Sequence, residues 1–364
     1  MLSGLFERLV RRIDGPLMAA LALTVALGLT VVYSAGGASV DRVAGQARNL
    51  AVALLALWIF AHIPPQTLMR LALPTYLVGL ALLVGVALFG DVRNGARRWL
   101  SIGITTIQPS EIMKIGVPLV LAWYFHRHEQ GLRLRDFVVA AIILAIPVGL
   151  IVRQPDLGTA LLIGASGFYV LFLAGLSWKV MVGLVAVAAG VGPMVWTHMH
   201  DYQRERILTF LDPGRDPLGT GYHSMQASIA LGSGGVVGKG WLNGTQTHLD
   251  FLPERHTDFI FAVFGEEFGL VGAAVLLVLY LLLIGRAMVI TANASTLFAR
   301  LLAGAITLMF FTYAFVNMAM VSGLLPVVGV PLPLVSYGGT ALISLFIGLG
   351  ILMSVQANRK LVMT

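Results

Sequence analysis

Asp258 is the residue best placed to do chemistry, because it stands where a polar stretch gives way to a strongly apolar run. The surrounding sequence, 250–267, reads DFLPERHTDFIFAVFGEE. A charge inside a membrane core costs roughly 2.5–3.5 kcal/mol. An acid in this position either does chemistry or simply caps the next helix. Glu266 would lie about 12 Å deeper along that helix.

Two Gln-Pro motifs place further charges where apolar runs begin. In QPSEIMK (108–114), Glu111 and Lys114 share one helix face and can pair. The pair either satisfies itself or lines a cavity that faces water. In QPDLGTA (154–160), Asp156 falls in the first helical turn, where the helix dipole favours an acid. Asp156 is therefore either a simple helix-start acid or part of a polar site shared with the first motif.

The stretch GSGGVVGKG (232–240) resembles a phosphate-binding loop but does not fit the Walker pattern. Gly240 follows Gly238-Lys239 where Ser or Thr is required, and Ser233 occupies the place of the first glycine. A flexible turn is favoured, and Lys239 stays a candidate to meet an anionic substrate. No His or Cys motif indicates a metal site, although an acid-bound Mg²⁺ or Mn²⁺ would leave no sequence signature.

The elements that must position these residues are membrane helices. Hydrophobic residues make up 58% and charged residues 11% of the 364, whereas soluble domains carry about 25% charged residues. The fold class is therefore an all-α polytopic membrane protein, expected as one domain over 1–364. Cysteine is absent, which excludes disulfides and thiol catalysis. The net charge of +7 is explained by loops that flank membrane spans, so no nucleic-acid partner is expected. About ten spans are predicted, at 17–34, 47–63, 71–89, 110–125, 136–152, 157–174, 178–197, 258–284, 299–321 and 335–356.

The distribution of Lys and Arg predicts the orientation. These residues are more numerous in the segments that lie inside when both termini are cytoplasmic than in the short outer loops. The first apolar run is interpreted as a retained span, not a cleaved signal. The one long loop, about 198–257 between spans 7 and 8, then lies outside. Within it YQRERILTFLDP is expected to form an interfacial helix.

The run 301–358 contains no Asp, Glu, Lys, Arg or His. It is interrupted only by SGLLPVVGVPLP (322–333), which is too apolar for an ordinary loop. Non-helical backbone at membrane depth needs protein or a cavity around it. This segment, which leads to Ser336, is therefore expected to re-enter the outer membrane edge, either as the wall of a groove for a lipid chain or as simple packing of small residues.

Several of these motifs resemble one family. FLPERHTDFIFAVFGEEFGLVG (251–272), QPSEIMK, QPDLGTA and PVVGVPLPLVSYGGT (326–340) look like those of the SEDS family (shape, elongation, division and sporulation). The resemblance covers nearly the whole chain. PERHTDFIFA and VVGVPLPLVSYGG are similar to the versions in the rod-shape branch rather than the division branch.

The resemblance implies a peptidoglycan glycosyltransferase that polymerises lipid II during cell elongation, on the outer face of the bacterial cytoplasmic membrane. Its implied partners are the nascent glycan strand, a class B penicillin-binding protein, other membrane proteins of the elongation complex and membrane lipids. It implies an essential Asp258, dependence on a divalent cation (Mg or Mn), and a polar cavity that includes Glu111, Lys114 and Asp156.

Physical reasoning agrees with that activity. An anionic polyprenyl pyrophosphate calls for a basic mouth, for which the candidates are Arg97, Arg98, Lys239 and Arg255, and for an apolar groove near Ser336. A pyrophosphate leaves without a general acid when its charge is stabilised. One carboxylate then suffices as base in an inverting displacement. A lipid II flippase and a non-catalytic scaffold for cell-wall assembly remain alternatives.

Overall fold

The computed structural model describes residues 12–93, 96–102, 105–199, 201–212, 214, 220–248 and 254–359. Its long helices coincide with the ten predicted spans. Seven of them are long and apolar enough to cross a membrane, while α7 and α8 have shorter apolar stretches and α5 carries charge at its start. The helices are α2 (Gly15–Ala35), α3 (Val40–His62), α4 (Pro65–Phe89), α5 (Pro109–Arg127), α6 (Leu134–Arg153), α7 (Leu157–Leu173), α8 (Trp178–His198), α12 (Ile260–Ala292), α13 (Leu297–Val321) and α14 (Thr340–Ala357).

Several helices begin at side chains suited to capping. Asp14 accepts a hydrogen bond from the Leu17 amide at the start of α2, and Thr296 accepts one from the Ala299 amide at the start of α13. Pro109 opens α5, where its fixed backbone angle suits a first turn. These caps satisfy amide groups that would otherwise have no partner in a membrane.

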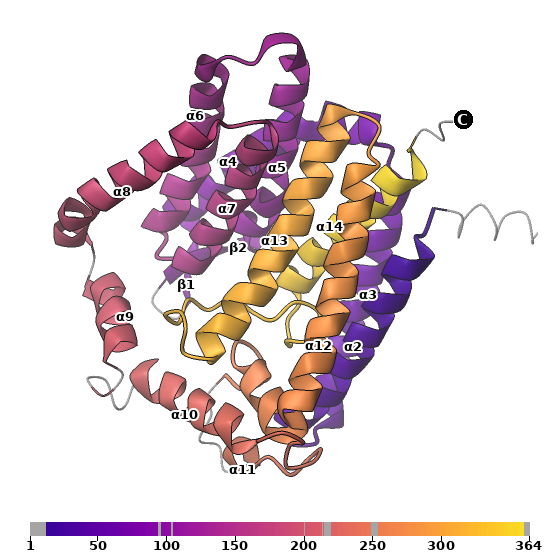
Figure 1. The fold of residues 1–364 in the computed structure, drawn as a ribbon, viewed down its shortest axis with the longest axis vertical. Helices are drawn as coiled ribbons and strands as arrows, with labels where there is room; N and C mark the ends of the chain where they lie inside the picture. Colours follow the sequence, from indigo (N-terminus) through magenta and orange to yellow (C-terminus); the bar gives the residue numbers. More distant parts are fainter. Residues whose placement is uncertain are drawn as a thin grey trace, which may run out of the picture.

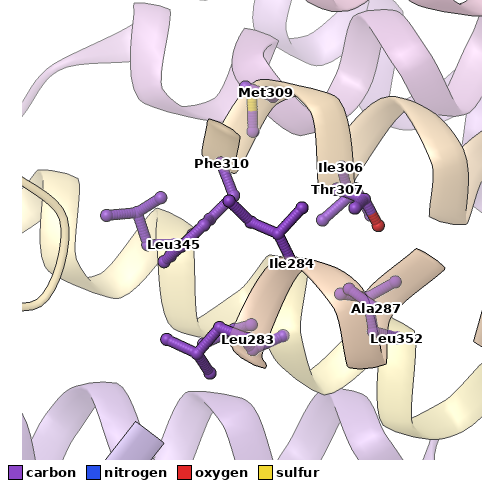
Figure 2. Close-up of a pocket in the computed structure, with 11 residues that line it drawn as sticks. Leu283, Ile284, Ala287, Ile306, Thr307, Met309, Phe310, Leu345 and Leu352 are labelled. Carbon is purple, nitrogen blue, oxygen red and sulfur yellow. The ribbon is translucent and has the colours of Figure 1, made fainter. Parts of the chain in front are cut away.

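Helix α13 is the centre of the bundle. Most of its side chains are buried, whereas α12 and α4 expose many large apolar residues, as expected of faces that meet lipid. Figure 1 shows α13 between α7 on one side and α12 and α14 on the other. In Figure 2, side chains of α12, α13 and α14, among them Leu283, Phe310 and Leu345, converge. The void between them is only about 10 Å³. Dense packing of this kind holds a fixed helix arrangement.

Two short segments lie outside the predicted pattern. Strands β1 (Asp91–Arg93), β2 (Ala96–Ile102) and β3 (Thr105–Ile107) form an antiparallel sheet in the order β1-β2-β3 between α4 and α5. The helix prediction missed this sheet, because strands of three to seven residues bury too little apolar surface to leave a strong periodic signal. A 3-10 turn (Glu129–Gly131) joins α5 to α6.

The long loop folds into helices at one end of the bundle, here called the loop end. These are α9 (Asp201–Leu211), α10 (Thr220–Ser233) and α11 (Thr245–His248). In Figure 1, α8 leaves the bundle and α9 to α11 continue along its lower end. The helix predicted from YQRERILTFLDP is confirmed as α9, with Phe210 and Leu211 exposed.

Helix α12 is broken near the loop end. Gly269 has φ +63 and ψ −161 within a helix of 33 residues, longer than the predicted span 258–284. The stretch 234–240 fills the break: the amides of Lys239 and Gly240 donate to the carbonyls of Glu266 and Glu267, each at 3.0 Å. The amides of Leu270 and Val271 in turn donate to Gly235 and Val236. The glycine-rich stretch is thus a backbone brace, which differs from the flexible turn that the sequence favoured.

Candidate functional site

The turn 254–259, which precedes α12, carries Asp258 and is held by three donors. The Tyr337 amide donates to the carbonyl of residue 256 at 2.8 Å, and the Ser336 hydroxyl donates to the carbonyl of residue 257 at 2.6 Å. The Asn317 side-chain amide donates to the carbonyl of Asp258 at 2.7 Å. Three successive carbonyls are therefore fixed by α13 and by the non-helical segment 322–339.

The Asp258 carboxylate itself has no hydrogen bond or ion pair with any residue that the structure describes. It is half-buried, and α12 begins two residues later at Ile260 with Phe259 at its N-cap and no side-chain capping bond. Burial, together with the charge of Glu254, raises the pKa of Asp258 to about 6, and the charge of Arg206 opposes the shift. The capping alternative for Asp258 is thus not what the structure shows.

Glu111 and Lys114 form the pair that their spacing predicted. The Lys114 ammonium lies 2.6 Å from Glu111, and the other Glu111 oxygen accepts from Ser344 of α14 at 2.7 Å. Lys114 is buried, with its ammonium 5.3 Å from the centre of the Tyr313 ring on α13. The pair is therefore bound into three helices rather than standing alone.

Asp156 joins the two Gln-Pro motifs. Its carboxylate caps α7 by accepting from the Thr159 amide at 3.2 Å and also accepts from Gln108 at 3.3 Å. The Arg98 guanidinium lies 3.8 Å from it and donates to the carbonyl of Pro155. Asp156 is thus a helix-start acid and also a contact between motifs, so both interpretations hold in part.

The start of α7 meets the Asp258 region through segment 322–339. A Cβ placed on Gly158 would lie 2.4 Å from the Val328 carbonyl oxygen, so only glycine allows this approach. Gly329 is the next residue along the chain, and a Cβ placed on it would lie 3.4 Å from Oδ2 of Asp258. The backbone of 328–329 therefore separates the α7 start from the catalytic candidate.

Sequence reasoning missed two residues of α13 that connect these groups. Tyr313 contacts Lys114, and Asn317, one turn further on, holds Asp258. The available signal for Asn317 was its polar side chain within an otherwise apolar helix. Burying an amide without hydrogen-bond partners costs free energy, so such a residue is expected to have partners. Tyr313 gave no signal apart from its type.

The other predicted site residues are spread around the loop end. Arg97 is exposed on β2 and Arg255 is half-buried in the turn beside Asp258. Lys239 lies 2.7 Å from Glu266, so part of its charge is neutralised within the protein. Ser336 is buried, and its hydroxyl also accepts from the Leu332 amide at 2.8 Å, so it fixes backbone. Contact of any of the four with substrate stays a prediction.

A cavity of about 490 Å³ lies between α3, α4, α5 and α14. Glu111, Gln108 and Ser344 line its polar end, and Ile115, Leu119 and Ile351 belong to its apolar part. Leu71 lines it and is also 45% exposed, so the cavity reaches the lipid-facing surface. An apolar cavity is therefore present, but its walls are these helices and not segment 322–333, where the groove was expected.

The described residues contain no group of three or more acids and histidines that would hold a metal ion on its own. The unpaired carboxylate of Asp258 fits a more limited role. Mg²⁺ is commonly bound by one or two carboxylates together with substrate phosphates. A cation that arrives with a pyrophosphate is compatible with this site, and it stays a prediction.

These features define a multi-pass membrane protein with a polar site at one end of its helices and an apolar cavity that opens toward lipid. A family model described as "Cell cycle protein", for FtsW, RodA and SpoVE, matches residues 16–361. The chain belongs to this family, the SEDS family.

Its relatives carry consistent names. The chain is 50% identical over 346 residues to peptidoglycan glycosyltransferase MrdB of Escherichia coli, covering 95% of this chain and 93% of that protein. It is 36% identical to the probable peptidoglycan glycosyltransferase FtsW of Trichlorobacter lovleyi, covering 95% and 93%.

Solved structures agree with this assignment. A chain from a study of the "structural coordination of polymerization and crosslinking by a peptidoglycan synthase complex" matches with a TM-score of 0.83 and 35% identity, over 96% of this chain and 98% of that one. The crystal structure of the Thermus thermophilus rod-shape-determining protein RodA matches with a TM-score of 0.72 and 31% identity, over 95% and 97%.

Proposed function

We propose that this protein is a peptidoglycan glycosyltransferase that polymerises lipid II, a disaccharide-peptide on a polyprenyl pyrophosphate, during cell elongation. The observation that carries the proposal is the Asp258 carboxylate, which is half-buried and unpaired among the described residues, with a pKa raised to about 6. A base whose pKa lies near the working pH is efficient. The names of the relatives support the same activity.

In the proposed reaction the 4-hydroxyl of the acceptor sugar attacks the anomeric carbon of the donor. The bond from that carbon to the pyrophosphate oxygen breaks, and Asp258 takes the hydroxyl proton. The displacement inverts the anomeric centre. A divalent cation, when bound with the pyrophosphate, would stabilise the departing charge. Arg255, three residues before Asp258 in the same turn, is a candidate to add to this stabilisation.

The polyprenyl chain would occupy the cavity between α3, α4, α5 and α14. Its apolar lining suits hydrocarbon, and its polar end at Glu111 and Ser344 lies at the loop end, where Asp258 also stands. The buried Lys114 would remain charged there because Glu111 accompanies it. In this arrangement the headgroup stays at the polar end while the tail remains among apolar side chains.

The protein is a multi-pass membrane protein, and its proposed location is the bacterial cytoplasmic membrane with both termini inside and the loop end outside. The proposed partners are a class B penicillin-binding protein, for cross-linking, and other membrane proteins of the elongation complex. The structural match to a polymerising and cross-linking synthase complex supports the first of these.

The decisive experiment measures glycan chains made from labelled lipid II by purified protein together with its transpeptidase partner. The wild-type protein should lengthen chains, and Asp258→Asn should not, while its unfolding temperature is not lowered. Polymer from the Asp258→Asn protein at the wild-type rate would refute the role of the base. Transbilayer movement of lipid II in proteoliposomes without polymerisation by the complex would favour a flippase. Normal growth of cells with Asp258→Asn would favour a scaffold.

A further inference from the structure

Asn317 makes the most direct contact between the helix bundle and the backbone of the proposed base. It is fully buried on α13, and its side-chain nitrogen donates to the carbonyl of Asp258 and to the carbonyl of Val330, both at 2.7 Å. From these contacts we infer that Asn317 is a positioning residue for Asp258, acting on the carboxylate through the backbone on both sides of it. This inference rests on the proposed function.

The orientation of the Asn317 amide is fixed by its surroundings. Two carbonyl oxygens accept from its nitrogen, so the nitrogen and oxygen cannot exchange places. The side-chain oxygen is buried and has no hydrogen-bond partner among the described residues. A buried acceptor without a partner lowers stability. A contribution to stability alone therefore explains this amide poorly. What the amide does provide is two donated hydrogen bonds, which hold the backbone on both sides of the carboxylate.

The two carbonyls that Asn317 holds belong to different segments, the turn 254–259 and the segment 322–339. The first is that of Asp258, so this bond fixes where the side chain leaves the backbone. The second is that of Val330, the residue after Gly329, and a Cβ placed on Gly329 would lie 3.4 Å from Oδ2 of Asp258. One side chain thereby joins the backbone of the acid to the backbone that lies beside its carboxylate.

Other donors also join the turn 254–259 to segment 322–339 or support that segment, but none of them bonds to Asp258. Ser336 fixes the carbonyl of Thr257 and the Leu332 amide, and Tyr280 donates to the carbonyl of Pro333 at 2.6 Å. Both support the segment 322–339, yet neither bonds to Asp258. Among the described residues, the Asn317 side-chain amide is the only group that donates hydrogen bonds both to Asp258 and to segment 322–339.

The test compares Asn317→Leu, which keeps the volume but removes both donors, with Asn317→Ser, which keeps a hydroxyl donor. Tyr280→Phe is the matched control, because it removes one buried hydrogen bond to the same segment without touching Asp258. Each protein is purified with its transpeptidase partner. The measurements are the initial rate of lipid II polymerisation against substrate concentration and pH, and thermal unfolding.

We expect Asn317→Leu to lower kcat by about 100-fold, the size of effect that a misplaced catalytic group produces, with KM changed less than about threefold. The acid limb of its pH–rate profile should move to lower pH. Without the two hydrogen bonds, water should reach the carboxylate more easily, and hydration lowers the pKa of Asp258. Asn317→Ser should recover part of kcat, and Tyr280→Phe should keep the wild-type kcat and pH profile.

A purely structural role gives a different pattern, which would overturn the inference. Asn317→Leu and Tyr280→Phe would then lower the unfolding temperature alike, while kcat per folded molecule and the acid limb stayed at wild-type values. If Asn317→Leu does not fold, Asn317→Ser decides on the same measurements. Loss of polymerisation in the wild-type protein would instead refute the proposed function, so the two failures are distinguishable.

Discussion

Asp258 and Glu266 are acids on either side of the α12 start, and they lie in opposite surroundings. The Asp258 carboxylate is half-buried without a partner among the described residues, and donors surround its backbone instead. Glu266 is fully buried, and one of its oxygens accepts from Lys239 at 2.7 Å, Thr245 at 3.0 Å and the Gln246 amide at 3.1 Å.

The difference separates a reactive acid from a structural one. Glu266 is stabilised as a charge that holds the brace 234–240 against the break in α12, and one of its oxygens accepts three hydrogen bonds. Asp258 is fixed in place while its oxygens stay available to take a proton. Position near a membrane border is common to both, so the partners and not the position determine the role.

Replacing each acid by its amide should show the contrast between the two acids most clearly. Asp258→Asn removes the base, for which a loss of about 10²–10⁴-fold in polymerisation rate is expected. Glu266→Gln serves as the matched control and should retain most of the activity per folded molecule. Initial rates with labelled lipid II measure both, and equal losses in the two variants would contradict the contrast.

The raised pKa of Asp258 predicts a pH dependence. Activity should fall about tenfold for each unit of pH below about 6, because the protonated acid cannot accept the hydroxyl proton. An acid whose pKa is raised on folding binds its proton more tightly in the folded state, so its charge lowers stability as the pH rises past its unfolded pKa of about 3.9.

The stability consequence of that pKa can be measured separately. Asp258→Asn should therefore unfold at the same or a higher temperature than wild type at pH 8, with no such gain at pH 4. A lower unfolding temperature at pH 8 would show that the carboxylate is stabilised by partners, as Glu266 is.

Glu266→Gln should mainly affect stability. It weakens the bonds from Lys239 and Gln246, at a cost of about 1–3 kcal/mol, toward the lower end because Lys239 is partly exposed. Chemical or thermal unfolding in detergent measures the loss. Proteolysis at 234–240 should also become faster, since the brace loses an anchor, and unchanged proteolysis would argue against that coupling.

A smaller loss of activity than that of Asp258→Asn is expected for Gly329→Ala. Gly329 has φ +72, and an added Cβ would lie 3.4 Å from Oδ2 of Asp258. The backbone strain costs about 1–2 kcal/mol, and kcat should fall severalfold as the carboxylate shifts. Gly338→Ala is the control, because a Cβ there meets nothing within 4 Å and its φ is not positive. Equal polymerisation rates for Gly329→Ala and Gly338→Ala would show that Gly329 is not part of the site.

Hydropathy and helix-start residues predicted the ten long helices, because each span must satisfy its own backbone and so carries a local signal. Boundaries were less accurate. Helix α3 begins at Val40 rather than 47, and α12 ends at Ala292 rather than 284, since helices continue beyond the apolar core. The sheet at 91–107 was missed, although Asn94-Gly95 is a hairpin sequence.

The site was predicted in part. The spacing of Glu111 and Lys114 gave their ion pair, because both lie on one helix. The contact of Arg98 with Asp156 and that of Lys239 with Glu266 were not predictable, since they join residues far apart in sequence. The break at Gly269 depends on the brace, and Asn317 depends on carbonyls from two distant segments.

The cavity beside Leu71 has a consequence for how substrate concentration should be expressed. A ligand that enters from between the helices arrives by diffusion in the plane of the bilayer. Its effective concentration is then the mole fraction of lipid II in the membrane, not its amount per volume of buffer. Diluting vesicles at constant lipid composition should leave the rate per enzyme unchanged, whereas adding inert phospholipid should lower it.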